Sequence, residues 1–339
     1  MSKNVTMRDI AAKLDISVVA VSKAMSGKKG VSEELRLKIK RTADAMGYKY
    51  GTDSKKKSAL SNNIGIIVAE RYVSDNSFYL KFIRSISITI QKHDNYAFLH
   101  TLTSKNEEND ILPDIFKHQR VDGIIVLGQI ADKYSTEIIS TGTPVVFLDF
   151  YNELTSDNCI VCDGFYATYE MTNYLIRNGH KSIGFVGNIS STSSIQDRYL
   201  GYVKSLIEHA LPLHDYFLIS DRDSRTGEFI PLELPNIMPT AFVCNCDETA
   251  CRLITTLREN GYRVPEDVSV TGFDNSVYSS ISVPNITTVE VNTAQMAELA
   301  VESLLSKIKT PSNPIGMVQV KGKLVLKDSV ASLNYPQSV

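Results

Sequence analysis

The stretch VTMRDIAAKLDISVVAVSKAMSG, residues 5–27, has the pattern of two short helices joined by a tight turn. Thr6 is suited to cap the first helix, with Asp9 as its capping-box partner, and Ser17 is suited to cap the second. Apolar residues recur at helical spacing in three runs: Ile10, Ala11 and Leu14; Val18, Val21 and Met25; then Leu35, Ile39, Ala43 and Met46. Two such helices cannot bury a core alone, so the third run, residues 32–46, is predicted to complete a helix-turn-helix unit shaped for a DNA groove.

Charge divides the chain near the same place. Residues 1–57 hold 14 Lys and Arg against 6 Asp and Glu, a net charge of +8, whereas residues 58–339 hold 22 against 32, a net charge of −10. A basic region attracts a polyanion, and binding releases counterions from its phosphates. A charge run alone is usually a solvated surface, but basic helices in this frame favour double-stranded DNA as the partner.

Length and composition indicate a soluble protein of more than one domain. The chain has 339 residues, of which 43% are hydrophobic and 22% charged. Its N-terminus is polar, unlike a signal peptide, and no segment approaches the ~20 apolar residues of a membrane span. We therefore expect a cytoplasmic protein without a membrane partner.

The five cysteines do not form a convincing metal or redox site. Cys159 and Cys162 make a CxxC pair, but they lie in an apolar run that resembles a strand, whereas a redox CxxC usually opens a helix. No second CxxC completes a zinc set. We expect small buried residues here, and neither a metal nor a cofactor.

Residues 51–63 are polar, include three successive lysines and read as a linker, after which apolar strands alternate with amphipathic helices. The predicted strands are 64–69, 96–101, 123–127, 144–149, 182–186, 216–220, 241–244 and 269–272, and the predicted helices are 79–90, 107–119, 165–178, 197–209 and 248–260. This alternation predicts an α/β fold with two doubly wound parallel sheets.

Ligands of such sheets bind beyond the carboxyl ends of the strands, where this sequence places charged and hydroxyl side chains. They are Asp149, the hydroxyl-rich run 190–194, Arg198, Asp247 and Asp274, with Phe78, Tyr79 and Phe150 nearby. Carboxylates, an arginine and aromatic faces suit a polyhydroxylated ligand. Two alternatives stay open: Asp247 as only a helix N-cap, and Phe78 and Tyr79 as core. We expect His180 to be a helix-end residue and not a catalytic one.

These motifs together resemble the LacI/GalR family of bacterial transcriptional regulators over nearly the whole chain. The resemblance rests on the opening stretch, on VSEELRLKIKRTADAMGY after it, and on VDGIIVLG, PVVFLD, YLIRNGHKSIGFVG, DRYLGY, GYRVPEDVSVTGFDN and ITTVEVNTAQMAELAVESLL in that order. It implies a homodimer with a helix-turn-helix head at 1–50, a hinge at 51–61 and a body at 62–339 similar to periplasmic sugar receptors. Subdomain 1 of that body would be 62–161 with 293–322, and subdomain 2 would be 162–290, with 323–339 as an open addition.

The same resemblance assigns site residues. Ser17, Val18, Val19, Ser22 and Lys23 would face DNA from the recognition helix, with the two valines reading thymine methyl groups. Thr6, Ser17 and Ser32 would donate to phosphates. The matching effector positions are Phe78, Tyr79, Asp149, Phe150, Ser194, Arg198, Asp247 and Asp274.

Three positions depart from the family pattern. In the hinge, Tyr50-Gly51 replaces the family's usual proline region, and Lys57 falls where its leucine would be. Two alternatives stay open: Leu60 serves after a register shift, or Lys55, Lys56 and Lys57 hold phosphates. Cys246 replaces an amide donor. Arg222 replaces an aromatic residue near the cleft, which indicates either an acidic or phosphorylated ligand or a side chain turned to solvent, and we expect the latter.

The sequence therefore predicts a dimeric DNA-binding regulator, a repressor in preference to an activator, controlled by a sugar, phosphosugar or nucleoside. A sugar receptor without a DNA role is the first alternative. A nucleotide-cofactor enzyme is the second, although neither GxGxxG after a strand nor GxxxxGK[ST] occurs.

Overall fold

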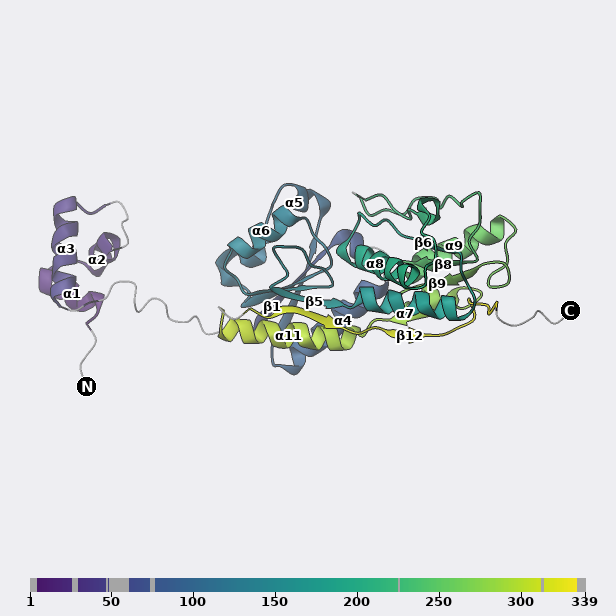
Figure 1. The fold of residues 1–339 in the computed structure, drawn as a ribbon. Helices are drawn as coiled ribbons and strands as arrows, with labels where there is room; N and C mark the ends of the chain where they lie inside the picture. The colour runs from purple at the N-terminus through teal and green to yellow at the C-terminus, as the bar shows by residue number, and fades with distance from the viewer. Residues whose placement is uncertain are drawn as a thin grey trace. The chain divides into compact units, whose positions relative to one another are not determined.

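The computed structural model describes residues 5–25, 30–46, 48, 61–73, 77–224, 226–311 and 314–333. The chain divides into two compact units, a head of residues 1–61 and a body of residues 62–339 (Figure 1).

The head is built from three helices, as the sequence predicts: α1 (Met7–Leu14), α2 (Val18–Met25) and α3 (Glu33–Ala45). Thr6 and Asp9 form the expected capping box, in which the Thr6 hydroxyl oxygen accepts from the Asp9 amide and the Asp9 carboxylate accepts from the Thr6 amide. The core consists of six fully or almost fully buried side chains: Ile10, Ala11, Val21, Ala24, Ile39 and Ala43.

The first sheet of the body has six parallel strands. Their order is β11 (Gly316–Val320), β5 (Asn158–Cys162), β4 (Val145–Leu148), β3 (Gly123–Leu127), β1 (Asn63–Ala69) and β2 (Tyr96–Leu102). Helices cover both faces: α4 (Ser77–Lys92) and α11 (Thr293–Lys309) one face, and α6 (Asp132–Ser140) the other (Figure 1). Side chains alternate accordingly, so that Ile66 packs toward α4 and Ile67 toward α6.

The second sheet has four parallel strands, in the order β7 (Leu218–Ile219), β6 (Ile183–Val186), β8 (Ala241–Cys244) and β9 (Ser269–Thr271). Helices α7 (Gly164–Arg177) and α8 (Ser193–Glu208) cover one face, and α9 (Asp247–Glu259) covers the other. Two sheets covered on both faces confirm the predicted fold class.

The chain passes between the two subdomains three times. It crosses after β5, again between β10 (Thr288–Glu290) and α11, and last between β11 and β12 (Lys323–Val325), which pairs antiparallel with β10. Three connecting segments permit the subdomains to rotate about them while each keeps its own core. No helix in the described ranges is long and apolar enough to cross a membrane.

Three predicted elements differ in the structure. The helix expected over 107–119 is wrong, because the chain forms α5 (Ser104–Glu108) and a separate 3-10 helix (Asp114–Gln119) on either side of Pro113, which cannot continue a helix. Helix α8 begins at Ser193 and not at 197, since the Thr192 side chain caps it. Of the strand expected over 216–220, only Leu218 and Ile219 form β7, because a 3-10 helix (Asp215–Phe217) occupies the start of the segment.

Candidate ligand cleft and nucleic-acid interface

A cavity of about 1250 Å³ lies between the two subdomains of the body. Its walls come from the carboxyl ends of strands in both sheets and from the start of α8, with Tyr79, Asp149, Arg198 and Asp274 among its lining residues. This is where a ligand of a parallel α/β sheet is expected, and the volume is ample for a small metabolite.

Arg198 is the buried cation of this cavity. Its side chain is only 7% exposed, its Nη1 donates to the Asn245 carbonyl at 2.6 Å, and its Nη2 lies 3.4 Å from Asp274 Oδ1. The guanidinium carbon also stands 3.8 Å from the ring centroid of Phe273. Burial opposes its charge, but the nearby carboxylates of Asp274 and Asp149 outweigh that effect and raise its pKa.

Asp274 contacts Arg198 directly, whereas Asp149 acts on it electrostatically from the other subdomain. Both aspartates have left-handed backbones, with φ of 69° at Asp149 and 101° at Asp274, a conformation that concentrates at functional sites. Burial raises the pKa of Asp149 to about 6 and that of Asp274 to about 8, while the charge of Arg198 opposes both shifts. Tyr79 donates its hydroxyl to Asp149 Oδ2 at 2.9 Å. Two carboxyl groups near one guanidinium supply both acceptors and donors for ligand hydroxyl groups.

The structure brings the four other predicted effector residues to different places. Phe78 and Ser194 line the large cavity, although Phe78 is also a buried core residue packed against Phe82. Phe150 does not line it, since its ring packs edge-on against Phe147. Instead it borders a separate cavity of about 10 Å³, room for one water molecule.

Asp247 is not brought to the cavity. Its carboxylate is fully buried and accepts from the Ser276 amide at 2.6 Å and from the Thr288 hydroxyl at 2.5 Å. The alternative interpretation of Asp247 as an N-cap is wrong, because the N-cap of α9 is Cys246, whose sulfur accepts from the Thr249 amide. Asp247 therefore joins the end of β9 to β10 instead of contacting a ligand.

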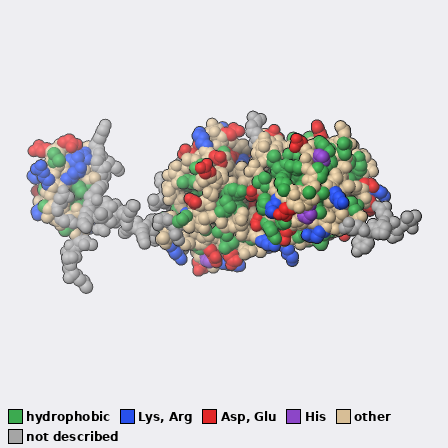
Figure 2. All heavy atoms as spheres, viewed as in Figure 1, with side chains coloured by type: hydrophobic (Ala, Val, Ile, Leu, Met, Phe, Trp, Pro, Cys, Tyr) green, Lys and Arg blue, Asp and Glu red, His purple; other side chains and the backbone are tan. Residues whose placement is uncertain are grey.

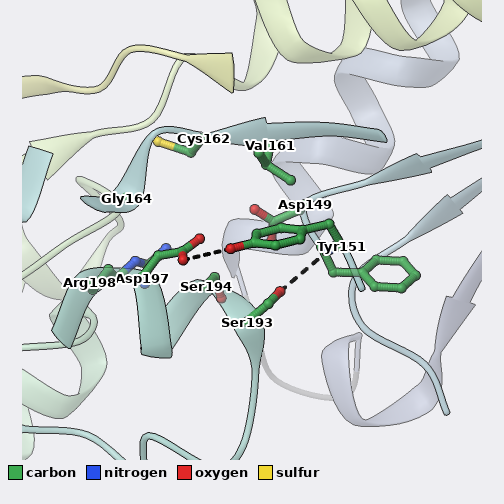
Figure 3. A pocket seen from close by; sticks show the side chains of 10 residues that line it. Asp149, Tyr151, Val161, Cys162, Gly164, Ser193, Ser194, Asp197 and Arg198 are labelled. Carbon is green, nitrogen blue, oxygen red and sulfur yellow. Dashed lines mark hydrogen bonds between the residues drawn. The ribbon is translucent and has the colours of Figure 1, made fainter. Parts of the chain in front are cut away.

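Hydrogen bonds link the two subdomains next to the cleft. Figure 3 shows Tyr151, which follows β4, donating its hydroxyl to Asp197 Oδ1 at 2.8 Å and its amide to Ser193 Oγ at 3.4 Å. The Ser193 amide in turn donates to Gln129 Oε1 of the first subdomain at 2.8 Å. The first turn of α8 is thus fastened to the opposite wall.

The expectation that Arg222 faces solvent is wrong. Its side chain is only 17% exposed, lines the cavity and forms an ion pair with the fully buried Asp221, whose two carboxylate oxygens it contacts at 2.8–3.1 Å. Sequence reasoning also missed Arg71, which binds Glu107 through two hydrogen bonds of 2.6 and 3.2 Å and lines the same cavity. Arg71 follows directly after β1, so the strand-end rule that found Asp149 applied to it as well.

In the head, α2 presents an apolar exposed edge. Val18 and Val19 are 41% and 63% exposed, and Ser22 and Lys23 are exposed beside them. Figure 2 shows Lys and Arg side chains on the surface of the same unit. This surface offers apolar contacts between charged groups, as a base-reading helix requires.

The hydroxyl groups predicted to bind phosphate differ in availability. Ser17 accepts from the Ala20 amide and Ser32 from the Leu35 amide, so their hydroxyl hydrogens can point outward. Thr6 donates its hydroxyl to Asp9 Oδ2 at 2.7 Å and would have to release that bond to reach a phosphate. Lys55, Lys56 and Lys57 lie outside the described residues.

Cys159, Cys162 and His180, whose side chains could be reactive, are buried within the fold. Cys159 and Cys162 lie in β5, as expected for a strand, and burial raises the pKa of their thiols to about 11 and about 12. His180 follows α7, is buried, and bonds Thr240 Oγ1 and the Ala331 carbonyl, which ties the C-terminal segment to the second subdomain.

Comparison with known proteins finds one domain family and several proteins named as repressors. The model of a periplasmic binding protein-like domain matches residues 172–330. The protein named "Probable HTH-type transcriptional repressor ExuR" of Bacillus subtilis is 27% identical, over 97% of this chain and 99% of its own. The ribose operon repressor of Haemophilus influenzae and the HTH-type transcriptional repressor PurR of Glaesserella parasuis are each 25% identical over 97% of this chain and 99% of theirs.

Solved structures share the fold. The lac repressor dimer bound to operator and an anti-inducer aligns over 97% of this chain and all of its own, with a TM-score of 0.68 and 20% identity. The regulator CelR in complex with cellobiose aligns over 96% and 100%, with a TM-score of 0.69 and 19% identity. The three-helix head, the two-sheet body and the full-length similarity to proteins named as repressors all agree with the resemblance to the LacI/GalR family of bacterial transcriptional regulators.

Proposed function

We propose that this protein is a repressor that binds operator DNA through residues 1–50 and is controlled by a small carbohydrate-like effector in the cavity of residues 62–339. Residues 51–61 would connect the two. Transcriptional regulation would place the protein in the cytoplasm, where bacterial DNA lies. Its family members are regulators and not enzymes.

One observation supports the effector proposal most directly. Arg198 is buried near Asp149 and Asp274, at the cavity where strands of the two subdomains end. A ligand that bonds all three groups contacts both walls at once. Such a ligand binds a closed arrangement better than an open one, and only this difference in affinity can shift the population of states. Tyr79 offers an aromatic face beside the same carboxylate.

The DNA-binding proposal rests on α2. Val18 and Val19 would contact thymine methyl groups, Ser22 and Lys23 would lie beside them in the groove, and Ser17 and Ser32 would bind phosphates. A bound sugar would change the spacing of two such heads in a dimer, and so the affinity for a near-palindromic operator.

We assign the dimer contact of the first subdomain to β2 and α4. Strand β2 is the edge of its sheet, and its Tyr96, Phe98 and Leu99 are about half exposed or more, as are Leu80 and Ile88 on α4. An exposed apolar edge strand is a template for pairing with another chain, and a two-fold axis would cover the patch on both protomers.

The effector role is tested with the full chain and the variant Arg198→Ala. A thermal-shift screen against sugars and nucleosides first identifies a ligand, because a ligand bound at high occupancy raises the melting temperature. Operator fragments are selected from genomic DNA, and fluorescence anisotropy then measures operator affinity with and without that ligand. We expect Arg198→Ala to bind operator normally and to lose the ligand response.

The matched control is Arg263→Ala, which removes an arginine that is 71% exposed and paired with Asp267 outside the cavity. It should keep both activities. An Arg198→Ala protein with an unchanged ligand titration would refute the proposed effector site.

A further inference from the structure

A short hairpin of the second subdomain borders the cavity. Arg222 and Phe229 pair as an antiparallel bridge, and the Asp223 amide donates to the Glu228 carbonyl at 2.9 Å. At its turn, Gly227 has φ of 75°, and a methyl group placed on it would lie 3.8 Å from Arg71 Cδ of the first subdomain. The hairpin therefore reaches across the cavity to the opposite wall.

The hairpin holds one guanidinium in a fixed position. Arg222 Nε and Nη2 contact the buried Asp221 carboxylate, and Nη2 also lies 3.2 Å from Asn245 Oδ1 and 3.7 Å from Cys246 Sγ. Among the described residues Nη1 has no hydrogen-bond partner, so both of its hydrogens are available at the cavity surface. A guanidinium that is held along one edge and keeps one nitrogen open is suited to an anionic acceptor at that nitrogen.

A second arginine stands beside it. The ring centroid of Phe229 lies 4.7 Å from the guanidinium carbon of Arg222 and 4.1 Å from that of Arg252. Arg252 is 50% exposed and has one ion pair, with Glu248 on its own helix. One aromatic ring thus positions two cations that line the same cavity.

The opposite wall limits how much negative charge a ligand can carry. Glu70, Glu107 and Glu108 line it together with one cation, Arg71, which is already paired with Glu107. These carboxylates would repel a second negative charge that extends across the cavity. A carboxylate, with a single negative charge, therefore suits this cavity better than a phosphate dianion does.

We infer that the effector is a carbohydrate carrying one carboxylate, which Arg222 binds at the hairpin while its hydroxyl groups meet Arg198 and Asp149. This inference rests on the proposed function and narrows the effector to sugar acids. It gives Arg222 and Arg252 roles in specificity that are separate from the shared binding of hydroxyl groups.

The test compares matched pairs of ligands by titration calorimetry: galactose with galacturonate, glucose with glucuronate, and glucose 6-phosphate as the phosphate arm. We expect one acid to bind at least tenfold more tightly than its neutral partner. Arg222→Gln should remove about ten- to a hundredfold of the acid's affinity, the range of a charged hydrogen bond, and leave that of the neutral sugar unchanged.

Because Arg222→Gln leaves buried Asp221 without its cation, Arg252→Gln provides a second variant whose side chain is half exposed. Arg252→Gln should bind the acid severalfold more weakly, whereas Arg263→Gln should leave the affinity for both ligands unchanged. Equal or weaker binding of both acids, or preference for the phosphate, overturns the inference. If a neutral sugar then still alters operator affinity, the proposed function stands and only the inference of a sugar acid fails. If no sugar alters operator affinity, both the inference and the proposed function fail.

Discussion

Asp274 occupies the least favourable environment of the residues around Arg198. Its backbone is left-handed, and burial raises the pKa of its carboxyl group to about 8, with Arg198 opposing the shift and Asp247 and Asp149 adding to it. In the unfolded chain the same group ionises near pH 3.9. Between these two values the folded state binds more protons than the unfolded state, so the stability contribution present at low pH is lost as the pH rises toward 8.

Asp274→Asn removes this ionisation and should raise the melting temperature relative to the parent protein. The gain should be larger at pH 8.5 than at pH 5, where the native carboxyl is still protonated, and differential scanning fluorimetry across that range measures it. Asp267→Asn is the control, since the pKa of Asp267 is lowered to about 2 by hydrogen bonds from Arg263 and both states are ionised over the whole range. An Asp274→Asn gain independent of pH would contradict the interpretation.

For single residues, the sequence predicts the place in the fold better than it predicts the groups that the side chain contacts. Asp149 and Asp274 could be found because each follows a strand at the carboxyl edge of its own sheet, and Arg198 because it lies early in the helix after β6. Asp247 obeys the same rule, yet its carboxylate turns inward to Thr288, and this depends on backbone geometry beyond β9. Arg222 was expected in solvent because its buried partner, Asp221, is recognisable only once Asn245 and Thr249 surround it.

Among the elements, α2 carries the sharpest functional prediction. Val18 and Val19 are exposed at its first turn, while Val21 and Ala24 face the head core, so the two outer valines can change without opening a cavity. Val18→Ala with Val19→Ala should lower the preference for operator over a scrambled sequence by about tenfold, the order of one mismatched base pair. Affinity for scrambled DNA should stay nearly constant because phosphate contacts dominate it.

Fluorescence anisotropy with operator and scrambled duplexes at one salt concentration measures both affinities. Leu37→Ala is a control, because this residue is exposed on α3 and has no assigned DNA contact. Intact discrimination in the double variant would exclude the two valines as readers of bases.

Elements with strong local signals were predicted well from the sequence. Thr6 and Asp9 specify the start of α1, and the apolar runs of β1, β3 and β8 specify buried parallel strands. The prediction of one helix over 107–119 is wrong because Pro113 interrupts a segment whose apolar residues otherwise recur at helical spacing. The hairpin at Arg222 was missed because its pairing is a single bridge, stabilised by the ring of Phe229 between two arginines.

For the molecule as a whole, control requires that the effector distinguish two arrangements of the subdomains. In the described arrangement the two subdomains are joined beside the cavity, where Tyr151 bonds Asp197 and Ser193 bonds Gln129. These bonds favour closure of the subdomains independently of the effector. They therefore set the fraction of effector-free protein that is already closed, and with it the basal affinity for operator.

Tyr151→Phe deletes one of these bonds and keeps the ring. If closure is what the effector selects, the variant should be more open without ligand and bind effector about three- to tenfold more weakly, the order of one typical hydrogen bond in net free energy. By linkage, its basal operator affinity should move opposite to the effect of the ligand on the parent protein. Small-angle scattering should show a larger radius of gyration.

Tyr169→Phe is the matched control, because Tyr169 donates to Glu208 at 2.7 Å between α7 and α8, entirely within the second subdomain. If both variants behave alike, the Tyr151 bond does not govern closure, and the balance between states must then lie in the three connecting segments.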